Sequence, residues 1–241
     1  MGPVRLAIES ATDSLSVAAG RSDGEAVIAV VSGARQHATA MLRLIEDVLR
    51  PLRAGPADLG LVVVSDGPGS FTGLRVGITV AKALALGTGI PLWTASTLLV
   101  RAAGVWQPGE SVLSVAPALR GEVYAGAWQH GSDGLVTEVM APRTVGPGDR
   151  GVLPMVGRLV GEGPEELLAE LAQRTGGAAL TGAITQPRAD VLLQLLDRQG
   201  GARQIEDIST WEPLYGRPAE AQAKWERDHG RPLPDSTDHT R

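Results

Sequence analysis

The chain has 241 residues, a formal net charge of −5 and no cysteine, so disulfides, thiol catalysis and cysteine-based zinc sites are excluded. Its length suits one large or two small domains, and its 43% content of apolar residues is that of a globular protein. The mild acidity argues against a protein that binds nucleic acid alone over a broad basic surface.

Targeting and membrane segments are not expected from the pattern of apolar residues. The opening MGPVRLAIES reaches an acidic residue after a few apolar ones, which is not typical of a signal peptide. No apolar run approaches the roughly 18 residues that a membrane span needs. We therefore expect a soluble, cytoplasmic protein that does not contact a membrane.

Strands dominate the first part of the chain. Residues 4–8 and 15–19 are apolar and bounded by turn residues, which predicts a hairpin, and residues 26–31 predict a third strand. Residues 61–64 form a continuous aliphatic run, as in a strand buried on both faces. A further short strand is expected at 91–94.

Two helices are predicted among these strands. Met41, Ile45 and Val48 recur at helical spacing within residues 36–52, and charged residues occupy the opposite face. The second helix is expected over 73–86, because glycines and a proline follow it.

The pattern of strands and helices restarts at about residue 97. The expected strands are 111–116, 122–128, 135–140, 155–160 and 178–183, and the expected helices are 164–173 and 189–198. This order predicts an α/β protein with an N-terminal lobe over 1–98, a C-terminal lobe over 99–218 and a cleft between them. Residues 219–241 are polar and contain proline, which predicts a disordered tail.

The segment DGPGSFTGLRVG joins the buried strand to the second helix. Gly67, Gly69 and Gly73 permit unusual backbone angles, and Ser70 or Thr72 can cap the helix. The free N–H groups at such a helix start favour an anion such as phosphate. A tight turn that binds nothing is the alternative, since the lysine of a P-loop is absent and Thr72 stands where a dinucleotide fingerprint needs glycine.

The second helix carries a stripe of small residues at Gly77, Ala81 and Ala85, which are four residues apart. Such a stripe allows another backbone to approach closely. It can pack against the protein's own sheet, against helix 36–52, or against a partner.

Residues for catalysis or metal binding are not apparent. The four histidines are His37, His130, His229 and His239, and no two are four residues apart, as a helical metal pair would be. Ser70 does not lie in a Gly-x-Ser-x-Gly elbow. Glu9 and Asp13 could form an acid pair, but a solvated hairpin turn explains both. We predict no catalytic residue, no metal and no cofactor.

The run GPGSFTGLRVG, followed by KALALGTGIP, resembles the signature of the bacterial TsaB (YeaZ) family. Weaker similarities follow in the family's order over about residues 4–218, namely LAIESATDSLSVAAG, RQHATAMLRLIEDVL, GEVYAGAW, LVGEG and EPLYGRP. The resemblance implies a two-lobed actin/hexokinase/Hsp70-like (ASKHA) fold. Two departures are Glu9, where the family has aspartate, and Pro117 at the start of its Asp-Ala-Arg segment.

The same resemblance implies a part in making threonylcarbamoyladenosine beside the tRNA anticodon. The catalytic TsaD-type paralogue of that system carries a His-x-x-x-His metal pair, whereas this chain reads TASTLLVR there. The favoured interpretation is thus a non-catalytic partner subunit that reaches tRNA only through the complex. The resemblance also implies that an ATPase of the TsaE type joins the pair.

The interface with the TsaD-type paralogue is expected on helices 36–52 and 73–86, and the same helices could form a homodimer in isolation. The predicted interface residues are Met41, Ile45, Val48, Gly77, Ala81 and Ala85. The main alternative is a nucleotide-dependent transferase that uses the loop from Gly67 to Gly73. A weaker one is an inactive peptidase-like or chaperone-like protein.

Overall fold

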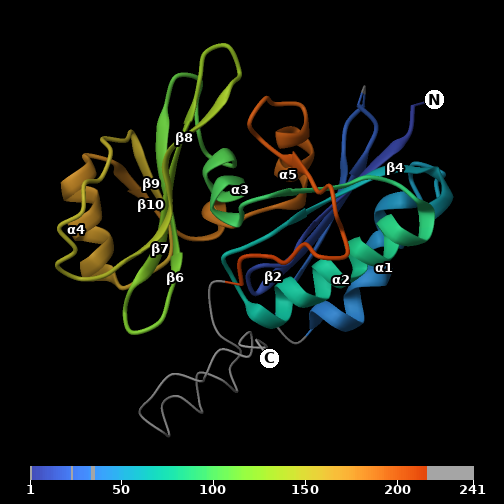
Figure 1. Cartoon of the computed structure of the whole chain (residues 1–241), viewed down its shortest axis with the longest axis horizontal. Helices are drawn as coiled ribbons and strands as arrows, with labels where there is room; N and C mark the ends of the chain where they lie inside the picture. Colours follow the sequence, from blue (N-terminus) through green and yellow to red (C-terminus); the bar gives the residue numbers. More distant parts are fainter. Residues whose placement is uncertain (1, 23, 34–35, 216–241) are drawn as a thin grey trace, which may run out of the picture.

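The computed structural model describes residues 2–22, 24–33 and 36–215. These residues form five layers, in which two mixed sheets alternate with three layers of helices (Figure 1). The predicted α/β fold class with two lobes is confirmed.

The first sheet has six strands in the order β11-β5-β4-β1-β2-β3. Strands β1, β2 and β3 are antiparallel neighbours, whereas β4 pairs parallel to β1 and β5 pairs parallel to β4. The bounds are β1 Val4–Glu9, β2 Ser14–Gly20, β3 Val27–Ser32, β4 Leu59–Ser65, β5 Leu92–Ala95 and β11 Arg203–Gln204.

The second sheet has five strands in the order β10-β9-β6-β7-β8. Its strands are β6 Ser111–Pro117, β7 Val123–His130, β8 Val136–Val145, β9 Arg158–Gly161 and β10 Ala178–Leu180. Three antiparallel strands are again followed by two parallel ones, so β8-β7-β6-β9-β10 repeats the order and orientation of β3-β2-β1-β4-β5. The two lobes share one topology.

Helices cover both faces of each sheet. They are α1 His37–Leu49, α2 Phe71–Thr88, α3 Thr97–Ala103, α4 Glu165–Thr175 and α5 Ala189–Leu196, with short 3₁₀ turns η2 Pro56–Asp58 and η3 Ala183–Thr185. Helices α1 and α2 cover the outer face of the first sheet, and α4 covers the outer face of the second (Figure 1). Gly89 and Gly176 end α2 and α4 in the left-handed conformation.

The layer between the sheets is filled by α3 and α5. One apolar cluster there joins Ala7 and Val63 of the first sheet to Val112 and Val160 of the second, through helix residues such as Leu98. The lobes therefore meet through a packed core.

The two lobes exchange helices across this layer. Helix α3 follows the first sheet in the chain but packs on β6 and β7, whereas α5 follows the second sheet but packs on β1 and β2. Strand β11 then pairs antiparallel with β5. The chain from Ala189 onwards thus returns to the first sheet, and the lobes are not two consecutive segments as the expected division at residue 98 assumed.

Most predicted elements lie within three residues of the observed ones, including both helices of the first lobe. Helix α3 was not predicted, and the strand expected at 178–183 ends at Leu180. The tail expected to be disordered, 219–241, lies outside the described residues. Within the described ranges no helix is long and apolar enough to cross a membrane.

Candidate functional site

The glycine loop, residues 66–70, connects the end of β4 to the start of α2. Gly67 has φ of +99°, a conformation that favours glycine. The hydroxyl of Ser70 accepts a hydrogen bond from the Gly73 N–H at 3.2 Å, so Ser70 is the N-cap residue of α2. The second predicted cap, Thr72, lies exposed in the first turn.

The glycines of this segment are required by the chain's own backbone. A Cβ on Gly67 would lie 2.0 Å from the carbonyl oxygen of Leu214, and one on Gly69 would lie 2.3 Å from that of Ala11. A Cβ on Gly73 would lie 2.1 Å from the carbonyl oxygen of Ser10. The loop therefore lies directly against two other segments of the protein.

Several N–H groups of the loop already donate within the chain. The Ser70 N–H donates to the Ala11 carbonyl at 2.7 Å, and the Gly67 N–H donates to the Thr97 hydroxyl at 3.2 Å. An anion site here stays a prediction, and the hydrogen bonds favour the alternative of a tight strand-to-helix turn.

A C-terminal strap, residues 203–215, holds the loop and α2 from outside. Arg203 forms an ion pair with Asp66 at 3.1 Å, and the Asp66 carbonyl accepts from the Leu214 N–H at 2.8 Å. Lys82 donates to the Trp211 carbonyl at 2.6 Å, and its ammonium lies 5.4 Å from the centre of the Trp211 ring. The sequence pattern gave no sign of this return, because the strap has no periodic apolar pattern.

Buried charge gathers where β1 ends. Glu9 is 0% exposed, and its Oε1 accepts from the Ala11 N–H at 2.8 Å. Burial raises the pKa of Glu9 to about 7, with the Ala11 hydrogen bond acting against it. Burial also raises the pKa of Asp66, although Arg203 opposes this. Asp13 is exposed, so it does not share the environment of Glu9.

All six predicted interface residues lie inside the first lobe. Met41, Ile45, Val48, Ala81 and Ala85 are at most 6% exposed, and Gly77 is buried as well. A Cβ on Gly77 would lie 2.2 Å from the Ser10 hydroxyl, so the small stripe faces β1. A partner that docked on these helices would contact their other faces rather than these six side chains.

Those outer faces carry exposed apolar side chains. Leu42 on α1 is 66% exposed and Leu86 on α2 is 65% exposed. Helices α1 and α2 pack side by side (Figure 1), so the two leucines belong to neighbouring helices of one layer.

The two histidines within the described residues lie in different lobes. His37 is buried at the first residue of α1, and His130 stacks on Trp106 with ring centres 4.7 Å apart while its Nε2 lies 2.7 Å from Arg198. His229 and His239 lie outside the described residues. Within residues 2–22, 24–33 and 36–215, no three potential metal ligands are grouped.

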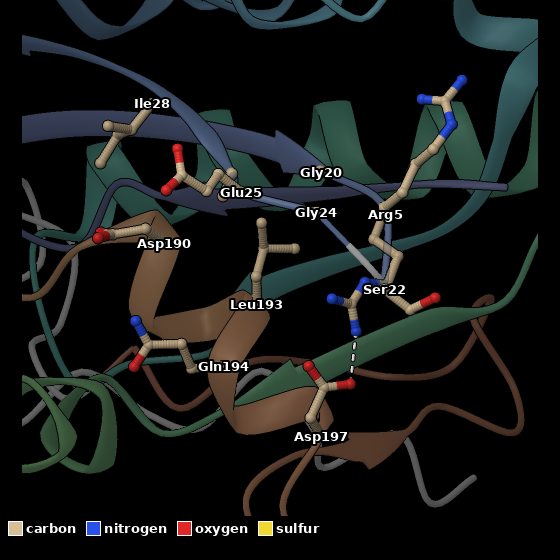
Figure 2. Close-up of a pocket in the computed structure, with 12 residues that line it drawn as sticks. Arg5, Gly20, Ser22, Gly24, Glu25, Ile28, Asp190, Leu193, Gln194 and Asp197 are labelled. Atoms are coloured by element: carbon tan, nitrogen blue, oxygen red, sulfur yellow. Dashed lines mark hydrogen bonds and ion pairs between the residues drawn. The ribbon is translucent and has the colours of Figure 1, made fainter. Parts of the chain in front are cut away.

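A hollow of about 410 Å³ lies at the opposite end of β1 from the glycine loop, between the β2–β3 hairpin and α5 (Figure 2). Its wall is charged, but Arg5 pairs with Asp197 at 2.6 Å and Asp190 pairs with Arg188 at 2.7 Å. None of the predicted site residues lines it.

The duplicated topology defines a class, the two-lobed α/β proteins of the actin/hexokinase/Hsp70-like type. Two solved structures from Pseudomonas aeruginosa have the same fold. One is YeaZ, with TM-score 0.71 and 24% identity over 89% of this chain and 100% of that one. The other is an uncharacterized protein with similarity to peptidase YEAZ. It has TM-score 0.74 and 24% identity over 90% of this chain and 100% of that one.

Sequence relatives specify the family. The tRNA threonylcarbamoyladenosine biosynthesis protein TsaB of Bacillus subtilis (strain 168) is 30% identical over 91% of this chain and 96% of its own length. The protein of the same name from Escherichia coli (strain K12) is 29% identical over 88% of this chain and 94% of its own length. The family model described as TsaD, tRNA N6-adenosine threonylcarbamoyltransferase, matches residues 31–141. This chain belongs to the TsaB family.

Proposed function

We propose that this chain acts in threonylcarbamoyladenosine biosynthesis as a non-catalytic subunit that supports a catalytic TsaD-type paralogue. The observation that carries the proposal is the relationship to B. subtilis TsaB, which spans nearly the whole of both chains. The stretch where the paralogue is expected to carry its metal-binding histidines is occupied here by the end of β5 and by α3, without histidine.

Docking is proposed on the outer faces of α1 and α2. Leu42 and Leu86 expose large apolar side chains there. Burying apolar surface is favourable by about 25 cal/mol per Å², so covering these side chains would stabilise a complex. Contact with the paralogue would remove both from water. In isolation, a second copy of this chain could cover the same face. A TsaE-type ATPase would join the complex with the paralogue. This chain would reach tRNA only through that complex.

Reconstitution tests this proposal. The chain, the TsaD-type paralogue, or both are incubated with the ATPase, tRNA and threonylcarbamoyl-adenylate, and the modified nucleoside is measured by mass spectrometry after digestion. We expect little product from either protein alone and a large increase with both. Equal product from this chain alone would refute the proposal and support the alternative, a transferase that uses the loop from Gly67 to Gly73.

A further inference from the structure

Four strands lie at the edges of the two sheets, where a strand has a neighbour on one side only. They are β11 and β3 in the first sheet and β10 and β8 in the second. Alternate residues of an edge strand direct their N–H and C=O groups away from the sheet, so an edge can pair with a further strand. Proteins usually protect such edges by keeping them short or by placing charges, proline or bulges in them.

Three of the four edges formed by the described residues are protected in this way. Strand β11 has two residues and β10 has three. Strand β8 is longer, but it carries Glu138, Pro142 and Arg143, and its pairing with β7 contains register shifts. These three edges therefore offer little to an incoming strand.

Strand β3 has none of these protections. Its six residues, VIAVVS, include no charged residue and no proline, and its pairing with β2 runs without a register shift. Among the residues that the structure describes, no backbone hydrogen bond joins β3 to a strand other than β2. The side chain of Val30 is 53% exposed. Strand β3 is thus an open edge of strand-forming residues.

Both faces of β3 are apolar. Val27, Ala29 and Val31 pack against the core cluster that includes α1, and Ile28 packs against the cluster between the sheets. Valine and isoleucine favour strands, and β-branched side chains on opposite residues of neighbouring strands stabilise a sheet. An added strand of the same composition would therefore find apolar neighbours on both faces.

We propose that β3 pairs with β3 of a second copy of this chain, antiparallel and about a two-fold axis perpendicular to the sheet. An identical strand fits this edge because β3 contains no charge that would meet its own kind across the axis. The register centred on Ala29 makes every opposing pair apolar. Its other pairs are Val27 with Val31 and Ile28 with Val30. The two first sheets then become one continuous sheet, and the symmetry closes the assembly at two copies.

The strength of this contact follows from its size. A pair of six-residue strands buries less than the roughly 1,600 Å² of a standard interface, so we expect a weak dimer with a dissociation constant on the order of 100 µM. The edge of β3 is a different surface from the outer faces of α1 and α2. The proposal therefore does not depend on the proposed function.

Sedimentation equilibrium of the full chain between about 5 and about 500 µM brackets this constant and tests the dimer. Val30→Lys places a charge in the open edge and should weaken dimerisation at least about tenfold. The matched control is Val139→Lys on β8, where the side chain is 42% exposed, and it should change dimerisation less than about threefold. Both side chains are exposed, so both variants should fold, which circular dichroism checks.

Two results would overturn the proposal. One is a monomer over the whole concentration range, and the other is an equal effect of Val30→Lys and Val139→Lys. Leu86→Arg on α2 separates this dimer from one built on the helices, because it should leave pairing through β3 intact. A dimer that is lost with Leu86→Arg but kept with Val30→Lys would assign the contact to the helices instead.

Cysteine cross-linking tests the register, since the chain has no cysteine of its own. Ala29→Cys places two thiols on directly opposite residues, whose Cα atoms lie about 4.5–5.5 Å apart in an antiparallel pair, within the range of a disulfide. Ser32→Cys is the control, because its side chain is more exposed but its two copies would lie about 20 Å apart. We expect mild oxidation to link Ala29→Cys at least about ten times faster. Faster linkage through Ser32→Cys would refute the proposed pairing.

Discussion

The two lobes contain the same strand-to-helix joint in two versions. In the first lobe, residues 66–70 connect β4 to α2, and in the second, residues 162–164 connect β9 to α4. Each joint has a glycine with positive φ in it or directly before it, and that glycine lies against the carbonyl of another segment: Gly67 approaches Leu214, and Gly161 at the end of β9 approaches Val115. Glycine at this joint thus serves close backbone contact in both lobes.

The joints differ in their electrostatics. Helix α2 has a serine cap and no acidic residue in its first turn. Helix α4 begins with Glu165 and Glu166 and has no side-chain cap. Acidic residues already occupy the favourable positions at the start of α4. A joint of this kind can thus carry acidic residues, which disfavour an anion, so the geometry of DGPGSFTGLRVG is not by itself proof of a phosphate site.

The largest expected effect comes from Gly73 of α2, which lies against Ser10, the residue after β1. Gly73→Ala places a Cβ 2.1 Å from the Ser10 carbonyl oxygen, and we expect it to lower the free energy of unfolding by about 3 kcal/mol or more. The control is Gly87→Ala in the same helix, where nothing lies within 4 Å of the added Cβ and a gain of up to about 1 kcal/mol is expected. Urea unfolding measures both, and equal stability of the two variants would contradict the packing role of Gly73.

The second lobe should respond in the same way if the joints are equivalent. Gly161→Ala combines φ of +129° with a contact of 2.0 Å to the Val115 carbonyl oxygen, so a loss of about 3 kcal/mol is again expected. The control is Gly182→Ala, where φ is +85° but the added Cβ meets open space. Only backbone strain should act there, and we expect a loss of stability of about 1 kcal/mol. A smaller loss for Gly161→Ala than for Gly182→Ala would show that the joint of the second lobe can relax.

The first strands of the lobes end differently, at Glu9 in β1 and at Pro117 in β6. The folded protein holds a proton on Glu9 up to about pH 7, whereas the unfolded chain releases it near the ordinary pKa of 4.5. Stability from this group is therefore present below pH 4.5 and is lost as the pH rises towards 7.

Glu9→Gln should remove that loss. We expect it to match the unmodified protein near pH 4.5 and to exceed it at pH 8 by on the order of 3 kcal/mol, measured by urea unfolding across this range. Asp66, whose pKa is also raised, is present in both proteins, and its repulsion of Glu9 is one of the causes of the raised pKa of Glu9. An identical pH dependence of the two proteins would show that Glu9 is not a buried acid.

The smallest expected effect concerns the Ser70 cap of α2, which has no counterpart in α4. Ser70→Ala removes the hydrogen bond to the Gly73 N–H and should cost about 1 kcal/mol. Thr72→Ala, at an exposed neighbouring position, is the control and should change stability by less than about 0.5 kcal/mol. A larger loss for Thr72→Ala would transfer the capping role to Thr72.

The sequence predicted local structure well, because helices such as α1 show their buried face at regular spacing in Met41, Ile45 and Val48. It indicated that the pattern restarts near residue 97, but not that the two lobes share one topology, since equivalent strands such as β1 and β6 have no common motif. Helix exchange also escaped prediction, because an apolar helix such as α3 does not specify which sheet it covers.

The candidate site was predicted only in part. The glycine loop and the Ser70 cap follow from residue types, whose conformational preferences are local. The stripe of Gly77, Ala81 and Ala85 signalled close approach correctly, but small residues do not specify whether the approaching backbone belongs to the same chain. The burial of Glu9 and of Arg101 was missed, because whether a charged residue is buried depends on the fold.

The central claim, that the outer faces of α1 and α2 dock the catalytic paralogue, is tested most directly by calorimetric titration of that paralogue with variants of this chain. Leu86→Arg charges the proposed face, and Ile184→Arg charges η3 of the second lobe, where the side chain is 70% exposed. The account predicts that Leu86→Arg weakens binding at least 30-fold, the size of an interface hot spot, while Ile184→Arg changes it less than threefold. Unchanged affinity with Leu86→Arg, or a larger loss with Ile184→Arg, would contradict it.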